Sequence, residues 1–99
     1  MKTIINGLDK AFDSRVRLGI MSSLAVNDTL DFISLKEYLD VTDGNLASHL
    51  KALEKKEFIG MKKSFIGRKP NTTYYMTKQG KTAFEQHITA LEKLIKSQR

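Results

Sequence analysis

The stretch that decides the fold is TDGNLASHLKALEKKEFIGMKKSFIGRKPNTTYYMT, residues 42–77. Its first part repeats leucine at helical spacing, because Leu46, Leu50 and Leu53 lie four and three residues apart. Its second part changes to the alternation of apolar and polar side chains that is typical of strands. The stretch therefore predicts an amphipathic helix followed by a β-hairpin.

A short helix is expected immediately before this one. In SLKEYL, residues 34–39, Ser34 and Glu37 have the spacing of a capping box, and Ile33 and Tyr38 occupy the flanking staple positions. The preceding LDFI is long enough for only one short extended segment. This helix is expected to end at about Asp40–Val41.

The two helices form a pair with a tight connection. Thr42 is a favoured N-cap residue, so the second helix is expected over residues 43–57. Two helices joined by about three residues are typical of a helix-turn-helix, here about residues 34–57. In the DNA-binding version of this motif the second helix enters the major groove.

The hairpin is expected to be anchored to the core through one face. Ile59, Met61 and Phe65 alternate onto that face, and Tyr74 and Met76 do so in the second run.

The loop of the hairpin is predicted as IGRKPN, residues 66–71. It holds Arg68, Lys69 and Pro70, the single proline of the chain. Proline cannot donate a ladder hydrogen bond, so Pro70 is expected to stiffen the tip and to interrupt the pairing.

A last helix is expected over about residues 78–97, with Thr77 as its cap. Its apolar side chains form an a/d seam that could pack against the chain's own domain or against a second copy. Together with an apolar stripe at the N-terminus they are expected to make a dimer contact. The residues of this predicted dimer contact are Ile4, Ile5, Leu8, Phe84, Ile88, Leu91 and Ile95. The whole chain is thus expected to be one α+β domain, mainly α, over residues 1–99.

Positive charge is concentrated in one third of the chain. The net charge is +6, and residues 51–81 hold nine Lys and Arg against two Glu. Such a block suits a polyanionic partner, although a lysine-rich face kept for solubility explains the charge alone equally well.

Several classes of protein are excluded or disfavoured by composition. The chain has no cysteine, so disulfides and thiolate metal sites are excluded. The two histidines, His49 and His87, do not have the spacing of metal ligands, and no catalytic constellation or cofactor motif is present. No apolar run is long enough to span a bilayer, and a cytoplasmic location is expected.

The sequence resembles a known family through two motifs in order, DGNLASHLKALE and GRKPNTTYYMTKQG. They are similar to motifs of the winged helix-turn-helix transcriptional regulators of bacteria and archaea related to the MarR and ArsR groups, over about residues 15–85. The resemblance implies a winged helix fold and sequence-specific binding of duplex DNA as a homodimer, usually for repression. It places the recognition helix at about residues 43–57 and the wing at about residues 66–71, within a hairpin segment of about 58–77.

Two departures from the family limit what the resemblance implies. ArsR-type metal sensors commonly use cysteine, which this chain lacks. MarR-type proteins are usually longer, with extra terminal helices that build an effector pocket. Metal sensing and a small-molecule effector are therefore not indicated.

On the recognition helix, Asn45, Ser48 and His49 are candidates for contact with base edges or phosphate. Alternatively, Asn45 is a polar residue near the N-terminus of the helix that satisfies the hydrogen bonding of backbone groups there. Lys51 and Lys55 follow on the same helix and are expected to contact phosphates, unless they only form a solvated face.

On the wing, Lys62, Arg68 and Lys69 are the candidate DNA contacts. An arginine at a wing tip can enter a narrow minor groove, where the negative potential is enhanced. The alternative is a solvated turn. For the protein as a whole, the alternative to a DNA-binding regulator is a winged helix that serves as a protein-interaction module, which has no need of the basic block.

Overall fold

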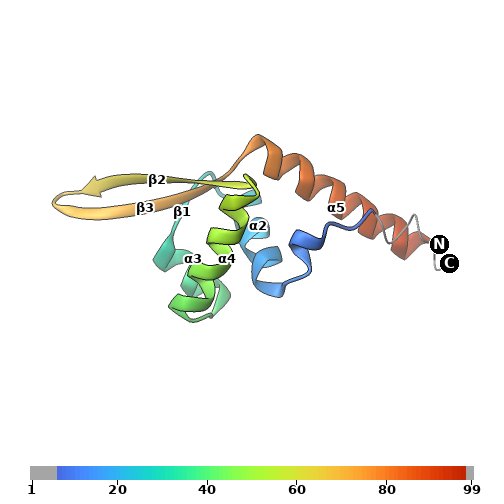
Figure 1. Cartoon of the computed structure of the whole chain (residues 1–99), viewed down its shortest axis with the longest axis horizontal. Coiled ribbons are helices and arrows are strands. Elements are labelled where there is room, and N and C mark those ends of the chain that lie inside the picture. The colour runs from blue at the N-terminus through green and yellow to red at the C-terminus, as the bar shows by residue number, and fades with distance from the viewer. Residues whose placement is uncertain (1–6, 98–99) are drawn as a thin grey trace.

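The computed structural model describes residues 7–97, in which helices cluster at the base of a long β-hairpin (Figure 1). The three strands form one antiparallel sheet in the order β1-β3-β2. In chain order the elements are η1 (Lys10–Phe12), α2 (Arg15–Ala25), β1 (Leu30–Asp31), α3 (Phe32–Leu39), α4 (Asp43–Lys55), β2 (Ile59–Ile66), β3 (Lys69–Met76) and α5 (Lys78–Lys96). The predicted fold class, a mainly helical α+β winged helix with a C-terminal helix, is confirmed.

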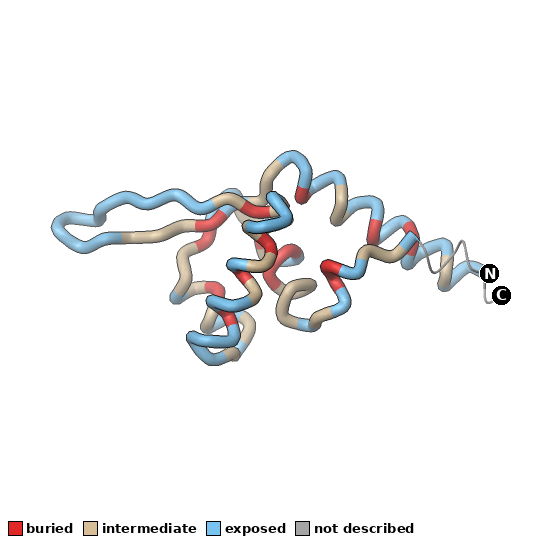
Figure 2. The backbone as a smooth tube through the Cα atoms, in the orientation of Figure 1, coloured by how far each residue is buried: buried red, intermediate tan, exposed pale blue. Residues whose placement is uncertain are grey.

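The core lies where α2, α3 and α4 meet the base of the sheet (Figure 2). The leucine face of α4 is confirmed, because all three of its leucines are buried. Each fully buried aliphatic side chain contributes about 1.5–3 kcal/mol relative to an exposed one. The largest fully buried side chains are Ile20, Met21, Leu35, Leu46, Leu50 and Leu53.

The first helix of the pair begins earlier than the capping box indicates. Asp31, not Ser34, is the N-cap of α3, because its carboxylate accepts a hydrogen bond of 2.8 Å from the Ser34 backbone N–H. Asp is as good a cap as Ser, and capping at Asp31 starts the helix at Phe32. Ile33 and Tyr38 are consequently exposed instead of forming a staple across the helix start.

A Schellman-type turn connects α4 to the sheet. The Glu57 N–H donates to the Glu54 carbonyl at 2.8 Å and the Phe58 N–H to the Leu53 carbonyl at 3.0 Å. Glu57 takes the left-handed position of this turn with φ of 64°. The side chain of Thr77 donates to the Glu57 carbonyl at 2.6 Å and so joins the start of α5 to the end of α4.

The strands of the wing reach closer to the tip, and its turn is tighter, than expected. Ile66 pairs with Lys69, so the loop holds only two residues, Gly67 and Arg68. Gly67 has φ of 64°, as the first central position of a type II′ turn requires. The expected six-residue loop is therefore wrong.

Pro70 lies inside β3, opposite Phe65, and does not interrupt the pairing. In an antiparallel ladder the pairs alternate between hydrogen-bonded and non-hydrogen-bonded, and a proline fits the second kind. β1 pairs only with Thr73 and Tyr74, so β3 is an outer strand at Pro70.

Only the base of the wing is anchored. Ile59 and Tyr74 are buried, whereas Met61 is partly exposed and Phe65 is 72% exposed. The expectation that Phe65 anchors the wing is wrong, because the strands extend beyond the core at that point (Figure 2).

Candidate nucleic-acid interface

The start of α4 is fixed by its cap and by an ion pair. Thr42 accepts from the Asn45 N–H at 3.2 Å, as predicted for an N-cap. The Lys36 ammonium lies 2.8 Å from the Asp43 carboxylate and links α3 to the first turn of α4. The cap and this exposed ion pair thus connect the two helices of the motif where they meet.

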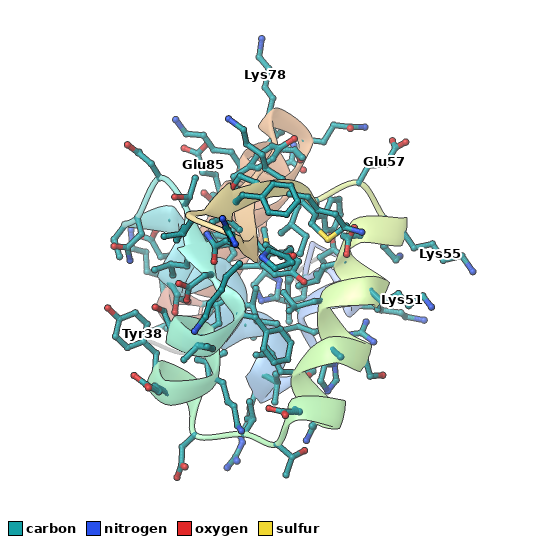
Figure 3. The ribbon with its side chains drawn as sticks, turned by 90° about the vertical axis from the view of Figure 1, so that its left-hand side faces the viewer. Tyr38, Lys51, Lys55, Glu57, Lys78 and Glu85 are labelled. Carbon is teal, nitrogen blue, oxygen red and sulfur yellow. The ribbon has the colours of Figure 1, made fainter. Side chains whose placement is uncertain are left out.

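The face of α4 opposite its leucines is open to solvent. Asn45, Ser48, Lys51 and Lys55 are all exposed. Figure 3 shows Lys51 and Lys55 extending outward from the same side of α4. This face offers an amide, a hydroxyl and two ammonium groups, which are the donors that base edges and phosphates accept.

His49 lies on the flank of this face, where it contacts α2. The Arg17 Nε–H donates to His49 Nδ1 at 3.0 Å, and His49 is half-buried. Because Nδ1 accepts, the neutral ring carries its proton on Nε2. Burial, and after it the Arg17 guanidinium, lowers the pKa of His49 below its ordinary value of 6.5.

Arg17 was missed by the sequence reading. It lies 32 residues before His49, and only the packing of α2 against α4 brings the two together. The nearest sequence signal is the pair Arg15 and Arg17 at the start of α2, which places two cations in one turn.

The basic residues of the wing are all exposed. Lys62 and Lys63 alternate in β2, yet both reach solvent because no core lies behind either side of the outer wing. Arg68 is in the turn itself, and Lys69 follows it at the start of β3. The wing projects beyond α3 and α4 and carries these cations away from the body (Figure 1).

The α5 stripe is only partly covered. Phe84 packs against the core, whereas Ile88, Leu91 and Ile95 are 37%, 39% and 58% exposed. Leu8 is half-buried. The other two residues of the predicted dimer contact, Ile4 and Ile5, lie outside the described residues.

The other side of α5 is occupied by the chain's own N-terminal segment. His87 is buried, its Nδ1 accepts from the Asp9 N–H at 3.0 Å, and its ring meets Phe12 edge-on at 5.1 Å between centroids. His87 therefore has a structural role in joining α5 to this segment.

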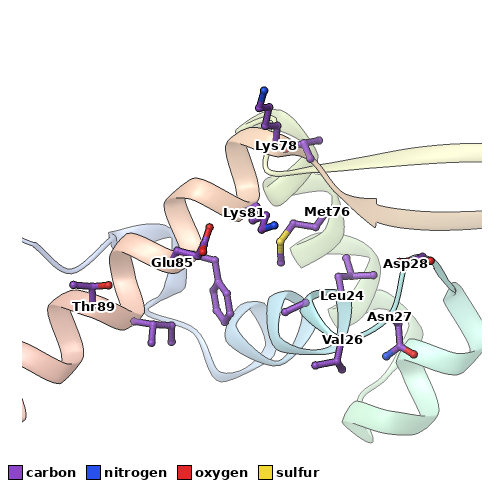
Figure 4. A pocket seen from close by; sticks show the side chains of 13 residues that line it. Leu24, Val26, Asn27, Asp28, Met76, Lys78, Lys81, Glu85 and Thr89 are labelled. Carbon is purple, nitrogen blue, oxygen red and sulfur yellow. The ribbon is translucent and has the colours of Figure 1, made fainter.

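A groove of about 750 Å³ runs between the end of α2 and the first half of α5 (Figure 4). Leu24 and Met76 line it together with Lys81 and Glu85, which come from α5. Ile88 belongs both to this groove and to the exposed stripe.

Among residues 7–97, no cluster of three or more His, Asp or Glu side chains is placed to hold a metal ion. No helix in the same part of the chain is long and apolar enough to cross a membrane.

Comparison with known proteins agrees with this geometry. The family model described as a winged helix DNA-binding domain matches residues 16–95. Protein MJ0432 of Methanocaldococcus jannaschii, described as uncharacterized, is 40% identical over 88 residues, which cover 89% of this chain and 96% of that protein.

Solved structures of transcriptional regulators have the same fold. A transcriptional regulator homologue from Pyrococcus horikoshii superposes with a TM-score of 0.85 at 29% identity, covering 97% of this chain and 93% of its own. A MarR-family regulator from Silicibacter pomeroyi superposes with a TM-score of 0.65 at 16% identity, covering 93% of this chain and 56% of its own. Bacillus subtilis PadR in complex with operator DNA superposes with a TM-score of 0.67 at 17% identity, covering 76% of this chain and 48% of its own.

Proposed function

Because the chain belongs to the family of winged helix DNA-binding domains, we propose that it is a homodimeric, cytoplasmic repressor that recognises a specific duplex sequence. The observation that carries the proposal is the exposed polar and basic face of α4 beside a wing that bears only positive charge. This arrangement fits a polyanion, which supports a role in binding.

In the proposed complex α4 lies in the major groove. Asn45 and Ser48 reach base edges from the first half of the helix, and Lys51 and Lys55 neutralise phosphates. His49 donates through Nε2, since Arg17 occupies Nδ1. Arg68 and Lys69 on the wing contact the flanking backbone or minor groove, with Lys62 further back along β2.

A matched pair of charge reversals tests this docking. Lys55 and Lys93 are both exposed and both lie in the last turn of a helix, so reversing either has a similar effect on its helix dipole. In fluorescence anisotropy with labelled duplex, Lys55→Glu is expected to lower affinity on the order of tenfold, whereas Lys93→Glu stays near wild type. Equal effects of the two reversals would contradict the docking.

The dimer is proposed to form through α5. Ile88, Leu91 and Ile95 form a contiguous apolar stripe that a second copy would cover. Leu91→Glu is expected to give a monomer by sedimentation at about tens of micromolar, a concentration at which wild type is a dimer. Thr82→Glu, an exposed position off the stripe, adds the same charge and should leave the dimer intact.

The decisive test of DNA binding is a salt titration with random duplex. Log K should fall linearly with log salt, by about 0.9 for each phosphate neutralised. Absence of binding at micromolar protein and low salt would overturn the proposal and favour the protein-interaction module.

A further inference from the structure

The outer wing carries apolar side chains that the fold does not use. Phe65 and Ile66 are 72% and 68% exposed, and all residues from 61 to 70 are exposed. Figure 2 shows this half of the hairpin extending clear of every buried segment. A wing that only neutralised phosphates would need no aromatic ring at this position.

The register places an aromatic ring and a proline together on one face of the wing. Phe65 pairs with Pro70, so their side chains lie on the same side, while Ile66 and Lys69 lie on the other. The next pair on the Phe65 face toward the core is Lys63 with Thr72. This polar pair separates the apolar tip from the buried base of the wing.

The charged residues near this apolar pair are all cations. Lys62, Lys63, Arg68 and Lys69 are within a few residues of it, and the sequence has no acidic residue between Glu57 and Glu85. Apolar side chains flanked by cations are complementary to a DNA groove, whose walls are phosphates and whose floor is formed by base-pair edges. Proteins that bind the minor groove commonly insert Phe, Ile or Pro between base steps.

We propose that the face carrying Phe65 and Pro70 lies over the minor groove beside the half-site read by α4, and that the Phe65 ring wedges into a base step there. This inference rests on the proposed DNA binding. Pyrimidine–purine steps such as TA unstack and bend most readily, so the wedge selects for such a step at a position that α4 does not touch. The wing thereby reads sequence through DNA deformability, and its cations hold the phosphates on either side.

A tryptophan probe tests the wedge directly. The chain has no tryptophan, so Phe65→Trp introduces a single fluorophore that keeps a large aromatic ring at the tip. Its emission is expected to be quenched when duplex DNA is added, because the indole stacks on bases. Unchanged emission at saturating duplex, with saturation followed by the anisotropy of a label on the DNA, would overturn the wedge.

The substitution Phe65→Thr distinguishes insertion of the ring into DNA from a structural role of Phe65 within the hairpin. Threonine favours strand conformation, as phenylalanine does, but removes the aromatic ring. Affinity for a duplex with a TA step in the flank should fall on the order of tenfold, the scale of one base–aromatic contact, and the preference for TA over AA should disappear. The slope of log K against log salt should stay unchanged, whereas Arg68→Ala should reduce it by about 1.

Unstacking of the base step is measured in the DNA itself, with the fluorescent base 2-aminopurine placed at the TA step. Its fluorescence should rise with wild type and not with Phe65→Thr. No rise with wild type, or a Phe65→Trp emission change with anionic phospholipid vesicles and none with duplex, would overturn the inference. If the wild-type chain binds duplex but these probes do not respond, only the wedge fails, whereas absence of duplex binding refutes the proposed function itself.

Discussion

Helix α4 and the outer wing are positioned by different means. One face of α4 is buried through Leu46, Leu50 and Leu53, and its flank contacts Arg17. In the part of the chain that the structure describes, the wing beyond the Lys62–Thr73 pair has only its own ladder and a two-residue turn to hold it. Side chains on α4 are therefore held in place by the core, whereas those on the outer wing are held only by the hairpin itself.

The largest difference between the two regions should be in stability. Leu50 is 1% exposed, and Leu50→Ala is expected to lower the free energy of unfolding by about 2–5 kcal/mol. Phe65→Ala removes a larger side chain from the wing but should cost less than about 1 kcal/mol, because no core surrounds it. Urea unfolding followed by circular dichroism measures both, and comparable losses would show that the outer wing has a buried partner.

The junction that joins the base of the wing to α5 should be the next most sensitive point. A Cβ on Gly80 would lie 1.9 Å from the Phe58 carbonyl oxygen, so Gly80→Ala forces two backbones apart. A loss of about 1–3 kcal/mol is expected in the same unfolding experiment.

Gly44 provides the matched control on α4. Nothing lies within 4 Å of a Cβ at this position, and Gly44→Ala should stabilise the helix by up to about 1 kcal/mol. If the two alanines had effects of the same sign, the close contact of α5 with Phe58 would not be the cause.

Substitutions in α4 and in the wing should have different kinds of effect on DNA binding. Asn45→Ala is expected to change the preference among sites by about tenfold at one base pair, because an amide reads adenine. Arg68→Ala should weaken binding to all sequences alike, because a phosphate or groove contact of this kind is made at every site. Competition binding with a panel of single-base variants measures both, and indifference to both changes would refute the docking of α4 and the wing.

The smallest expected effect is a pH dependence that involves His49. Its lowered pKa means that the unfolded chain takes up a proton at a higher pH than the folded chain does. The stability that depends on neutral His49 is therefore fully present above about pH 6.5. It is lost as the pH falls from there toward the lower pKa of the folded state. His49→Gln should flatten this part of the pH profile in urea unfolding, and an unchanged profile would assign the dependence to another group.

Much of the fold could be predicted from the sequence because its signals are local. Thr42 and Thr77 cap α4 and α5 as expected, and the leucine spacing in α4 identifies its buried face. The start of α3 was misplaced because Asp31 and Ser34 are both good caps, and only the packing of α3 selects between them.

The candidate site could be predicted in part. The exposed polar face of α4 follows from its helical period, and the basic turn of the wing follows from its composition. The contact between Arg17 and His49 depends on how two helices pack, and no local pattern encodes it. Alternation in β2 identified the face of Phe65 but not the point at which the core ends, so its exposure emerged only from the structure.

Selection of bound duplexes from a random pool tests the central claim most directly. We predict a two-fold symmetric site whose half-sites lie about 10–10.5 base pairs apart, or a multiple of that, as two α4 helices in successive major grooves require. No enriched sequence after selection, or a motif without two-fold symmetry, would contradict the proposal of sequence-specific DNA binding by a homodimer.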